Sequence, residues 1–265
     1  MVSTTSTSDL IGEPAPLVVD ERMIPDAGLP TEFVEGVLDI ANEGSGLLRP
    51  KNFAPSSNDI YISSSQIRRF NLRVGDFVGG QARRPKDNER YWGLLKVEKV
   101  NGDPVEELGT RANFDDLTVI YPEEKIKLST DKDALTTRVI DLVAPIGFGQ
   151  RGLIVSPPKA GKTWLVKDVI AGIAKNHKKT HLMAVLIGER PEEVTDIQRT
   201  VKEVTDGKGE AAASNFDEAP QDQTRVGELA LERAKRLVEK GMDVVIVLDS
   251  ITRMARAYNL ALPTS

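Results

Sequence analysis

The sequence predicts a two-domain α+β protein in which a small β-barrel is followed by an α/β domain. The length of 265 residues leaves room for two domains of ordinary size. Between about residues 33 and 121, short apolar runs alternate with turn residues, which is typical of a small barrel or sandwich. From about residue 137 onward, segments with strand and helix patterns alternate, which indicates a parallel sheet covered on both faces.

The composition excludes several classes of protein. The chain has 35 basic and 40 acidic side chains, a formal net charge of −5, two histidines and no cysteine. The lack of cysteine excludes a disulfide framework, a zinc ribbon and a thiolate nucleophile, and two histidines argue against a histidine-based metal site. No apolar run approaches the ~20 residues that span a bilayer, and the N-terminus lacks a secretory pattern. We therefore expect a cytoplasmic protein with no membrane partner.

The N-terminal part divides into a tail and a β-domain. Residues 1–30 are rich in Ser, Thr and Pro, and they carry too little apolar surface to offset the entropy of ordering. We expect this tail to be disordered, with a docking helix as the alternative. The β-domain is expected at 31–121, with a helical turn at 65–70. Its strands are predicted at 34–40, 59–62, 77–82 and 91–97.

The C-terminal part predicts an α/β domain at 137–265, which a polar, charged linker at 122–136 joins to the barrel. Its strands are predicted at 151–155, 181–187, 211–216 and 243–248. Its helices are predicted at 162–174, 191–204 and 224–239, the second with proline in its first turn.

The most informative stretch reads Gly-Leu-Ile-Val-Ser-Pro-Pro-Lys-Ala-Gly-Lys-Thr, at residues 152–163. A strand, a tight loop, Gly-Lys-Thr and a helix follow one another in the order of a phosphate-binding loop. The unpaired N–H groups at the start of the helix favour phosphate oxygens, and Gly161 allows close approach of the backbone. Lys162 supplies a positive charge, and Thr163 offers a hydroxyl to Mg²⁺. Ser156 stands where a glycine is usual, so an ordinary strand–turn–helix connection is the alternative.

Two carboxylates follow predicted strands of the same sheet. Asp249 ends the apolar run 244–248; taken alone it is more often a helix cap, but together with the phosphate loop it is expected to hold Mg²⁺. Glu189 follows the strand at 181–187 and could polarise an attacking water. Position alone favours this role and that of a helix-dipole partner equally.

Longer motifs carry a resemblance to a known family. In the α/β domain they read RVIDLVAPIG and GQRG at 138–152, ERPEEVT at 189–195, FDE at 216–218, and LDSITR and ARAYN at 248–259. In the β-domain they read DIYIS and SQIRRF at 59–70, and ERY and LLKV at 89–97. From about residue 33 to its end, the chain resembles the bacterial transcription termination factor Rho family.

The resemblance implies an RNA-dependent ATPase and helicase that forms a homo-hexameric ring and releases nascent transcripts from RNA polymerase. It implies an OB-like, cold-shock-like barrel and a RecA-type motor domain, with ATP and Mg²⁺ as cofactors. The implied catalytic residues are Lys162, Glu189 and Asp249, and the implied metal-binding residues are Thr163 and Asp249. The implied nucleotide contacts are Thr137, Gly147, Phe148, Gly149, Gln150, Arg151, Gly152, Lys159, Ala160, Gly161, Lys162, Thr163, Trp164 and Arg190.

In the barrel, the resemblance implies a site for single-stranded, pyrimidine-rich RNA, in which Tyr91 is suited to stack on a base. The implied RNA-binding residues are Gly44, Ser45, Gly46, Leu47, Leu48, Arg49, Asp59, Ile60, Tyr61, Glu89, Arg90 and Tyr91. The family usually carries aromatic side chains where this chain has Ser45 and Leu47. Because stacking contributes ~1–3 kcal/mol per base, we expect weakened RNA binding. Arg49 is retained for phosphate contact.

Two further departures concern the motor. Gly188 stands where the family usually has Asp, and a glycine there is expected to affect the direction in which the Glu189 carboxylate points. The sequence stops where the family continues into the second half of the motor, so the RecA-type domain is expected to be partial, with a gap in its sheet. We expect the chain alone to be a poor ATPase and no helicase. One alternative is an RNA-binding module with a vestigial nucleotide pocket. Another is a rotary-motor type ATPase, which the barrel motifs disfavour.

Overall fold

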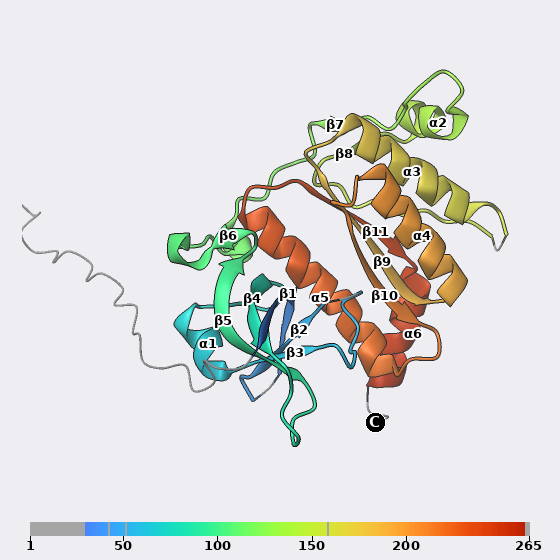
Figure 1. The fold of residues 1–265 in the computed structure, drawn as a ribbon. Helices are drawn as coiled ribbons and strands as arrows, with labels where there is room; N and C mark the ends of the chain where they lie inside the picture. Colours follow the sequence, from blue (N-terminus) through green and yellow to red (C-terminus); the bar gives the residue numbers. More distant parts are fainter. Residues whose placement is uncertain (1–29, 42, 51, 158, 263–265) are drawn as a thin grey trace, which may run out of the picture.

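The computed structural model describes residues 30–41, 43–50, 52–157 and 159–262, so the expected tail lies outside the described residues except for Pro30. The predicted class is confirmed: a β-barrel precedes an α/β domain, and the two lie side by side (Figure 1). Within the described part of the chain, no helix has the length and apolar character needed to cross a membrane.

The barrel is closed by a pairing between strands that are distant in the sheet. Its strand order is β3-β2-β1-β4-β5-β6, and β3 also pairs with β5. A capping box between Ser63 and Gln66 starts the short helix α1 (Ser64–Arg69). Fully buried side chains such as Leu38, Leu48 and Ile62 fill the interior. The strands are β1 (Thr31–Ile40), β2 (Gly46–Arg49), β3 (Ile60–Ile62), β4 (Phe77–Arg83), β5 (Trp92–Val100) and β6 (Asp103–Pro104).

The α/β domain is built on a parallel sheet of order β10-β9-β11. Alternate residues of β9 (His181–Glu189) point to opposite faces: Leu182, Ala184 and Leu186 contact the core under α3 and α4, and Met183, Val185 and Ile187 contact the core under α5. The remaining elements of the sheet and its cover are α3 (Lys162–Asn176), α4 (Pro191–Val204), β10 (Glu210–Asn215), α5 (Pro220–Glu239), β11 (Val244–Asp249) and α6 (Ile251–Ala261).

Part of the segment expected as a linker is packed into the α/β domain. Ile126 and Leu128 are buried in the core under α3. Gly172 on α3 lets the helix approach this segment, since a Cβ there would collide with the Leu128 carbonyl group. The connecting elements are η2 (Val105–Glu107), η3 (Phe114–Asp116), β7 (Lys125–Ile126), α2 (Leu135–Val143) and β8 (Ile146–Gly147).

The strand predicted at 151–155 is not formed, and this expectation was wrong. Residues 151–157 have no regular secondary structure, and Leu153 and Val155 are exposed. An apolar run becomes a strand only where a neighbouring strand pairs with its backbone, and the described sheet ends at β11 on this side. On β11, Ile246 and Leu248 are correspondingly exposed.

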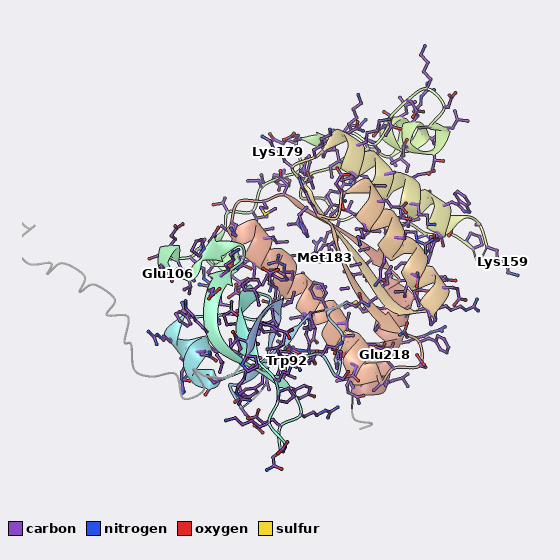
Figure 2. The ribbon with its side chains drawn as sticks, in the orientation of Figure 1. Trp92, Glu106, Lys159, Lys179, Met183 and Glu218 are labelled. Carbon is purple, nitrogen blue, oxygen red and sulfur yellow. The ribbon has the colours of Figure 1, made fainter. Side chains whose placement is uncertain are left out.

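Helix α5 lies between the two domains and contacts both (Figure 1). Val37 and Phe53 of the barrel share an apolar cluster with Val226, Leu229 and Ala230 of the helix. Figure 2 shows Met183 in the sheet next to this interface.

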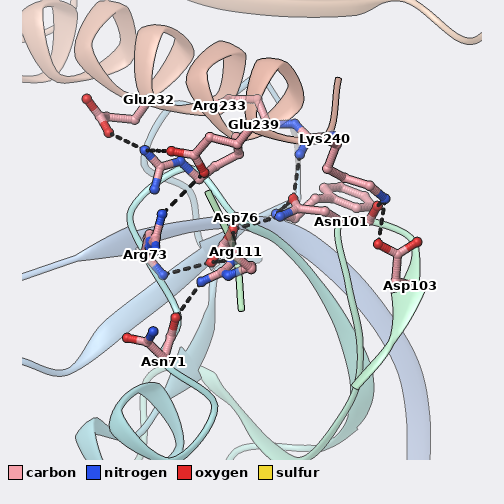
Figure 3. Close-up of polar contacts among 12 residues, drawn as sticks. Asn71, Arg73, Asp76, Asn101, Asp103, Arg111, Glu232, Arg233, Glu239 and Lys240 are labelled. Atoms are coloured by element: carbon pink, nitrogen blue, oxygen red, sulfur yellow. Dashed lines mark hydrogen bonds and ion pairs between the residues drawn. The ribbon is translucent and has the colours of Figure 1, made fainter. Parts of the chain in front are cut away.

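Polar contacts extend the interface along α5 (Figure 3). Asp76 is fully buried and accepts a hydrogen bond from Arg111 at 2.7 Å and another from Asn101 at 2.7 Å. Asn101 in turn accepts a hydrogen bond from Arg233 of α5 at 2.8 Å, and Arg233 also pairs with Glu210 on β10. The two domains are therefore joined by a continuous chain of charged and polar contacts.

Gly75 marks the closest approach of the barrel to α5, and we predict that Gly75→Ala destabilises the protein more than Gly102→Ala does. Both glycines have a positive φ, +86° and +90°, so alanine costs about 1–2 kcal/mol at either position. Only at Gly75 would the new Cβ meet the backbone of α5, 2.5 Å from the nitrogen of Arg233. We expect this collision to add about 1–3 kcal/mol, measured as the free energy of unfolding in urea. Equal destabilisation of the two variants would contradict the tight docking of α5.

Candidate functional site

The phosphate-binding loop leads into α3 with an uncapped helix N-terminus. Gly161 precedes the helix in a left-handed conformation, at φ +88°, and no side chain caps the first turn. The N–H groups of this turn are therefore available to an anion. Lys159 lies at the outer end of the loop, away from the barrel (Figure 2), and Ala160, like Lys159 and Gly161, is exposed.

Lys162 and Asp249 form an ion pair at the carboxyl-terminal edge of the parallel sheet. The Lys162 Nζ atom lies 2.6 Å from Asp249 Oδ1, so the start of α3 is tied to the end of β11. The Asp249 carboxylate is buried, whereas the lysine side chain is partly exposed. Thr163 follows Lys162 in the first turn of the helix. The two residues that sequence analysis assigned to phosphate and to metal are thus in direct contact.

Glu189 ends the central strand β9 next to β11, and its carboxylate is buried. Burial is the main cause that raises the pKa of Glu189 to about 7, and the neighbouring acids Glu193 and Asp249 act in the same direction. Arg253 of α6 opposes this shift, since its Nε atom lies 3.0 Å from the Glu189 carboxylate. This arrangement leaves a proton acceptor that titrates near neutral pH.

Gly188 adopts a positive φ of +63°, and its N–H donates a hydrogen bond to the Ser214 hydroxyl at 3.2 Å. A Cβ at this position would stand 3.0 Å from the Gln223 amide oxygen of α5. Glycine therefore suits the backbone conformation that precedes Glu189, because an L side chain there would be strained.

The other residues assigned to the nucleotide lie around α2, β8 and the outer surface. Thr137 is buried on α2, and Gln150 accepts a hydrogen bond from the Gly147 N–H at 2.9 Å. Phe148 contacts the His177 ring edge-on. Within the described residues, no hydrogen bond or ion pair joins these four positions to Lys162, Glu189 or Asp249. Gly149, Arg151, Gly152, Trp164 and Arg190 are exposed.

A groove of about 560 Å³ opens on the barrel, and six of the residues assigned to RNA line it. Its lining consists of Asp39, Ile40, Ala41, Ser45, Gly46, Leu47, Arg49, Tyr61, Tyr91 and Arg225. Tyr61 is 45% exposed, so its ring is accessible from the groove. The structure thus brings together Tyr61 and Tyr91, which are 30 residues apart in the sequence.

The remaining residues assigned to RNA support the groove or lie beside it. Leu48 and Ile60 are buried in the barrel core, and Asp59 is fully buried, where it accepts hydrogen bonds from Arg49 and from the Ser56 hydroxyl. Gly44 makes the turn before β2 at φ +81°. The Arg90 guanidinium lies 5.2 Å from the centre of the Tyr91 ring. Glu89 pairs with Arg83, which lowers the pKa of this exposed carboxylate to about 2.

Sequence reasoning missed two charged residues of the groove, Asp39 and Arg225. Arg225 belongs to α5 of the α/β domain, and its guanidinium donates to the Asp39 carboxylate of β1 at 2.9 Å. Neither residue belongs to a phosphate-loop or nucleic-acid motif. Only the docking of α5 brings Arg225 to the groove.

The comparisons with known proteins match each of the two domains to a family model. The model of the Rho termination factor RNA-binding domain matches residues 34–106. The model of the ATP synthase alpha/beta family nucleotide-binding domain matches residues 136–261.

Curated relatives match across both domains. Transcription termination factor Rho of Bacillus subtilis is 56% identical over 234 residues, which are 88% of this chain and 53% of the relative. The Thermotoga maritima protein of the same name is 52% identical over 88% of this chain and 54% of its own length. The chain thus spans about half the length of the curated relatives it matches. An RNA-binding domain and a nucleotide-binding domain in this order, at this level of identity, place the chain in the family of transcription termination factor Rho.

Proposed function

We propose that this chain supplies the RNA-binding groove and the nucleotide-binding part of an ATP-dependent RNA translocase that releases nascent transcripts. The observation that carries the proposal is that Lys162, Asp249 and Glu189 meet at one edge of the sheet, beside the uncapped start of α3. The same chain presents a groove with two accessible tyrosines and two arginines. A protein with both sites can couple nucleotide turnover to RNA.

The nucleotide's phosphates would bind at the N-terminus of α3, where Lys162 would move from Asp249 to a phosphate oxygen. Asp249 would then be free to face Mg²⁺ together with the Thr163 hydroxyl. Both groups are oxygen donors of the kind Mg²⁺ prefers, so the residues present fit this ion. Bound Mg²⁺ supplies charge neutralisation on the phosphates. The other nucleotide contacts predicted above, with Arg190 among them, would complete the site.

Glu189 would act as the proton acceptor for the attacking water. Its raised pKa matches the requirement that a general base titrates near the working pH. Arg253 would hold the carboxylate in place, because its Nε atom forms an ion pair with one of the two oxygens.

By family membership, we further propose that the full assembly is a homo-hexameric ring that acts on RNA polymerase, in the cytoplasm. A specific observation favours the alternative of an RNA-binding module with a weak nucleotide pocket. The segment 151–157 ahead of the loop is exposed and is not part of the sheet, so the loop lacks a strand as its anchor. Direct nucleotide binding distinguishes the two proposals.

We expect Lys162→Ala to abolish or weaken uptake of ATP with Mg²⁺, measured by isothermal calorimetry on the 265-residue chain. A hydrogen bond from a charged donor contributes about 1.5–3 kcal/mol, which corresponds to a loss of affinity of about tenfold or more. Lys167→Ala is the matched control, because this lysine lies on the same helix but pairs with Asp196. Lack of ATP binding by the wild-type chain would favour the RNA-binding module.

We expect Tyr91→Ala to weaken the binding of oligo(C) in a filter-binding assay. The loss of one stacking platform costs about 1–3 kcal/mol, which lowers affinity by about five- to 150-fold. Tyr121→Ala is the control, because Tyr121 is 87% exposed and does not line the groove. Equal and salt-insensitive binding by both variants would argue against a stacking site.

We expect Glu189→Gln to stabilise the protein at high pH and to have less effect at low pH. Between the ordinary pKa of Glu, 4.5, and its folded value of about 7, the folded state keeps a proton that the unfolded state has lost. The wild type therefore loses stability as the pH rises through this window, and glutamine removes that loss. The gain should grow by about 2–3 kcal/mol between about pH 5 and about pH 8 in urea unfolding, with exposed Glu192→Gln as control. A constant difference across this range would show that Glu189 is not held protonated.

A further inference from the structure

We propose that Arg225, which comes from the nucleotide-binding domain, belongs to the RNA groove and contacts a backbone phosphate of single-stranded RNA beside Arg49. This inference rests on the proposed RNA-binding function of the groove. It makes the groove a site formed by both domains.

Arg225 and Arg49 share one carboxylate. Arg225 donates to Asp39 Oδ1 through Nε at 2.9 Å and also through Nη2, and Arg49 Nη2 donates to Asp39 Oδ2 at 2.9 Å. The Asp39 side chain is only 9% exposed, so its two oxygens hold the two guanidinium groups at fixed positions. Arginines fixed side by side suit a phosphate group, which accepts several hydrogen bonds from a planar donor.

Arg225 keeps donors for a ligand. A guanidinium has five N–H donors, and the contacts to Asp39 and Glu228 use three of them. The Arg225 side chain is 36% exposed and lines the groove, so the remaining donors can reach a bound strand. In Arg49, the buried Nε–H has no hydrogen-bond partner among the described residues.

The charge of the lining depends on Arg225. Two arginines and one aspartate are the charged residues that line the groove, which leaves a single net positive charge. Removal of Arg225 would bring this net charge to zero. Because phosphate contacts dominate affinity for single strands, the loss of this charge should be measurable.

Because the groove offers few aromatic rings, its positive charge is more important for binding RNA. Its rings come from Tyr61 and Tyr91, while Ser45 and Leu47 offer no ring on which a base could stack. Phosphate contacts must therefore supply more of the binding free energy. Two residues before Arg225, Gln223 lies against Gly188, the neighbour of Glu189. An RNA strand held by Arg225 would therefore contact α5, the helix that also packs beside the nucleotide site.

The test is a salt series of oligo(C) binding to the full chain and to its Arg225→Gln, Arg225→Lys and Asp39→Asn variants. One lost phosphate contact should reduce the slope of log K against log salt by about 0.7, which is about fivefold weaker binding at ~0.1 M salt. Arg225→Lys keeps the charge and should keep the slope. Asp39→Asn removes the negative charge from the lining, while its amide oxygen can still accept a hydrogen bond from Arg225 and keep it in place, so binding should tighten. Arg199→Gln, on the exposed face of α4, is the matched control and should bind like the wild type.

The outcomes separate the two proposals. If the wild type binds and Tyr91→Ala weakens binding, but Arg225→Gln matches Arg199→Gln in slope, Arg225 only ties α5 to the barrel and the inference is overturned. Weaker binding by Asp39→Asn would overturn it as well, and this variant decides the matter if Arg225→Gln fails to fold. If the wild type does not bind oligo(C) at any salt concentration, the proposed RNA-binding function fails, and the inference fails with it.

Discussion

The docking of α5 between the barrel and the sheet is the constraint on which both sites depend. One side of this helix completes the apolar core under β9, and the same cluster includes Val37 and Phe53 of the barrel. Burial of these side chains supplies a non-directional free energy, which alone would allow the barrel to rotate on the helix. The contacts of Arg233 with Asn101 and Glu210 fix the orientation instead, since buried ionic groups must be paired in one geometry. As a result of this orientation, Arg225 of α5 lines the groove on the barrel.

In the candidate nucleotide site, the local sequence determines some features, and the neighbouring strands determine others. The uncapped start of α3 follows from the loop sequence and the helix alone, and its N–H donors do not need the sheet. The direction in which the loop points is not determined locally, because it depends on the strand that precedes the loop. Residues 151–157 are exposed, and in the described part of the chain β11 is an edge strand whose Ile246 and Leu248 lie on an uncovered face. Because residues 151–157 do not join the sheet, the Lys162–Asp249 ion pair connects the start of α3 to the sheet instead.

Sequence reasoning predicted the fold class and most elements because the signals were local. Helix α4 begins and ends where expected, at Pro191 and Val204, since proline fixes its first turn and an apolar stripe defines its length. The strand at 151–155 failed because pairing, not composition, makes a strand. The buried Leu128, in a segment that reads as a polar linker, was missed because its partner is the backbone at Gly172, 44 residues later. Of the residues at the candidate sites, those in motifs could be named from the sequence, whereas Asp39 and Arg225 could not, since 186 residues separate them.

Both candidate sites hold their cations on a carboxylate before any ligand arrives. Lys162 is paired with Asp249, and Arg225 and Arg49 are paired with Asp39. A phosphate that bound Lys162 would replace the Asp249 carboxylate as its partner, so the cation would not have to be desolvated anew. The exchange alone gives little affinity, because one ion pair is lost for each one gained. Net binding must therefore come from other groups: the N–H donors of α3 in one site, and the tyrosine rings and spare guanidinium donors in the other. In this way a chain with net charge −5 would bind polyanions at two small sites whose cations are paired beforehand.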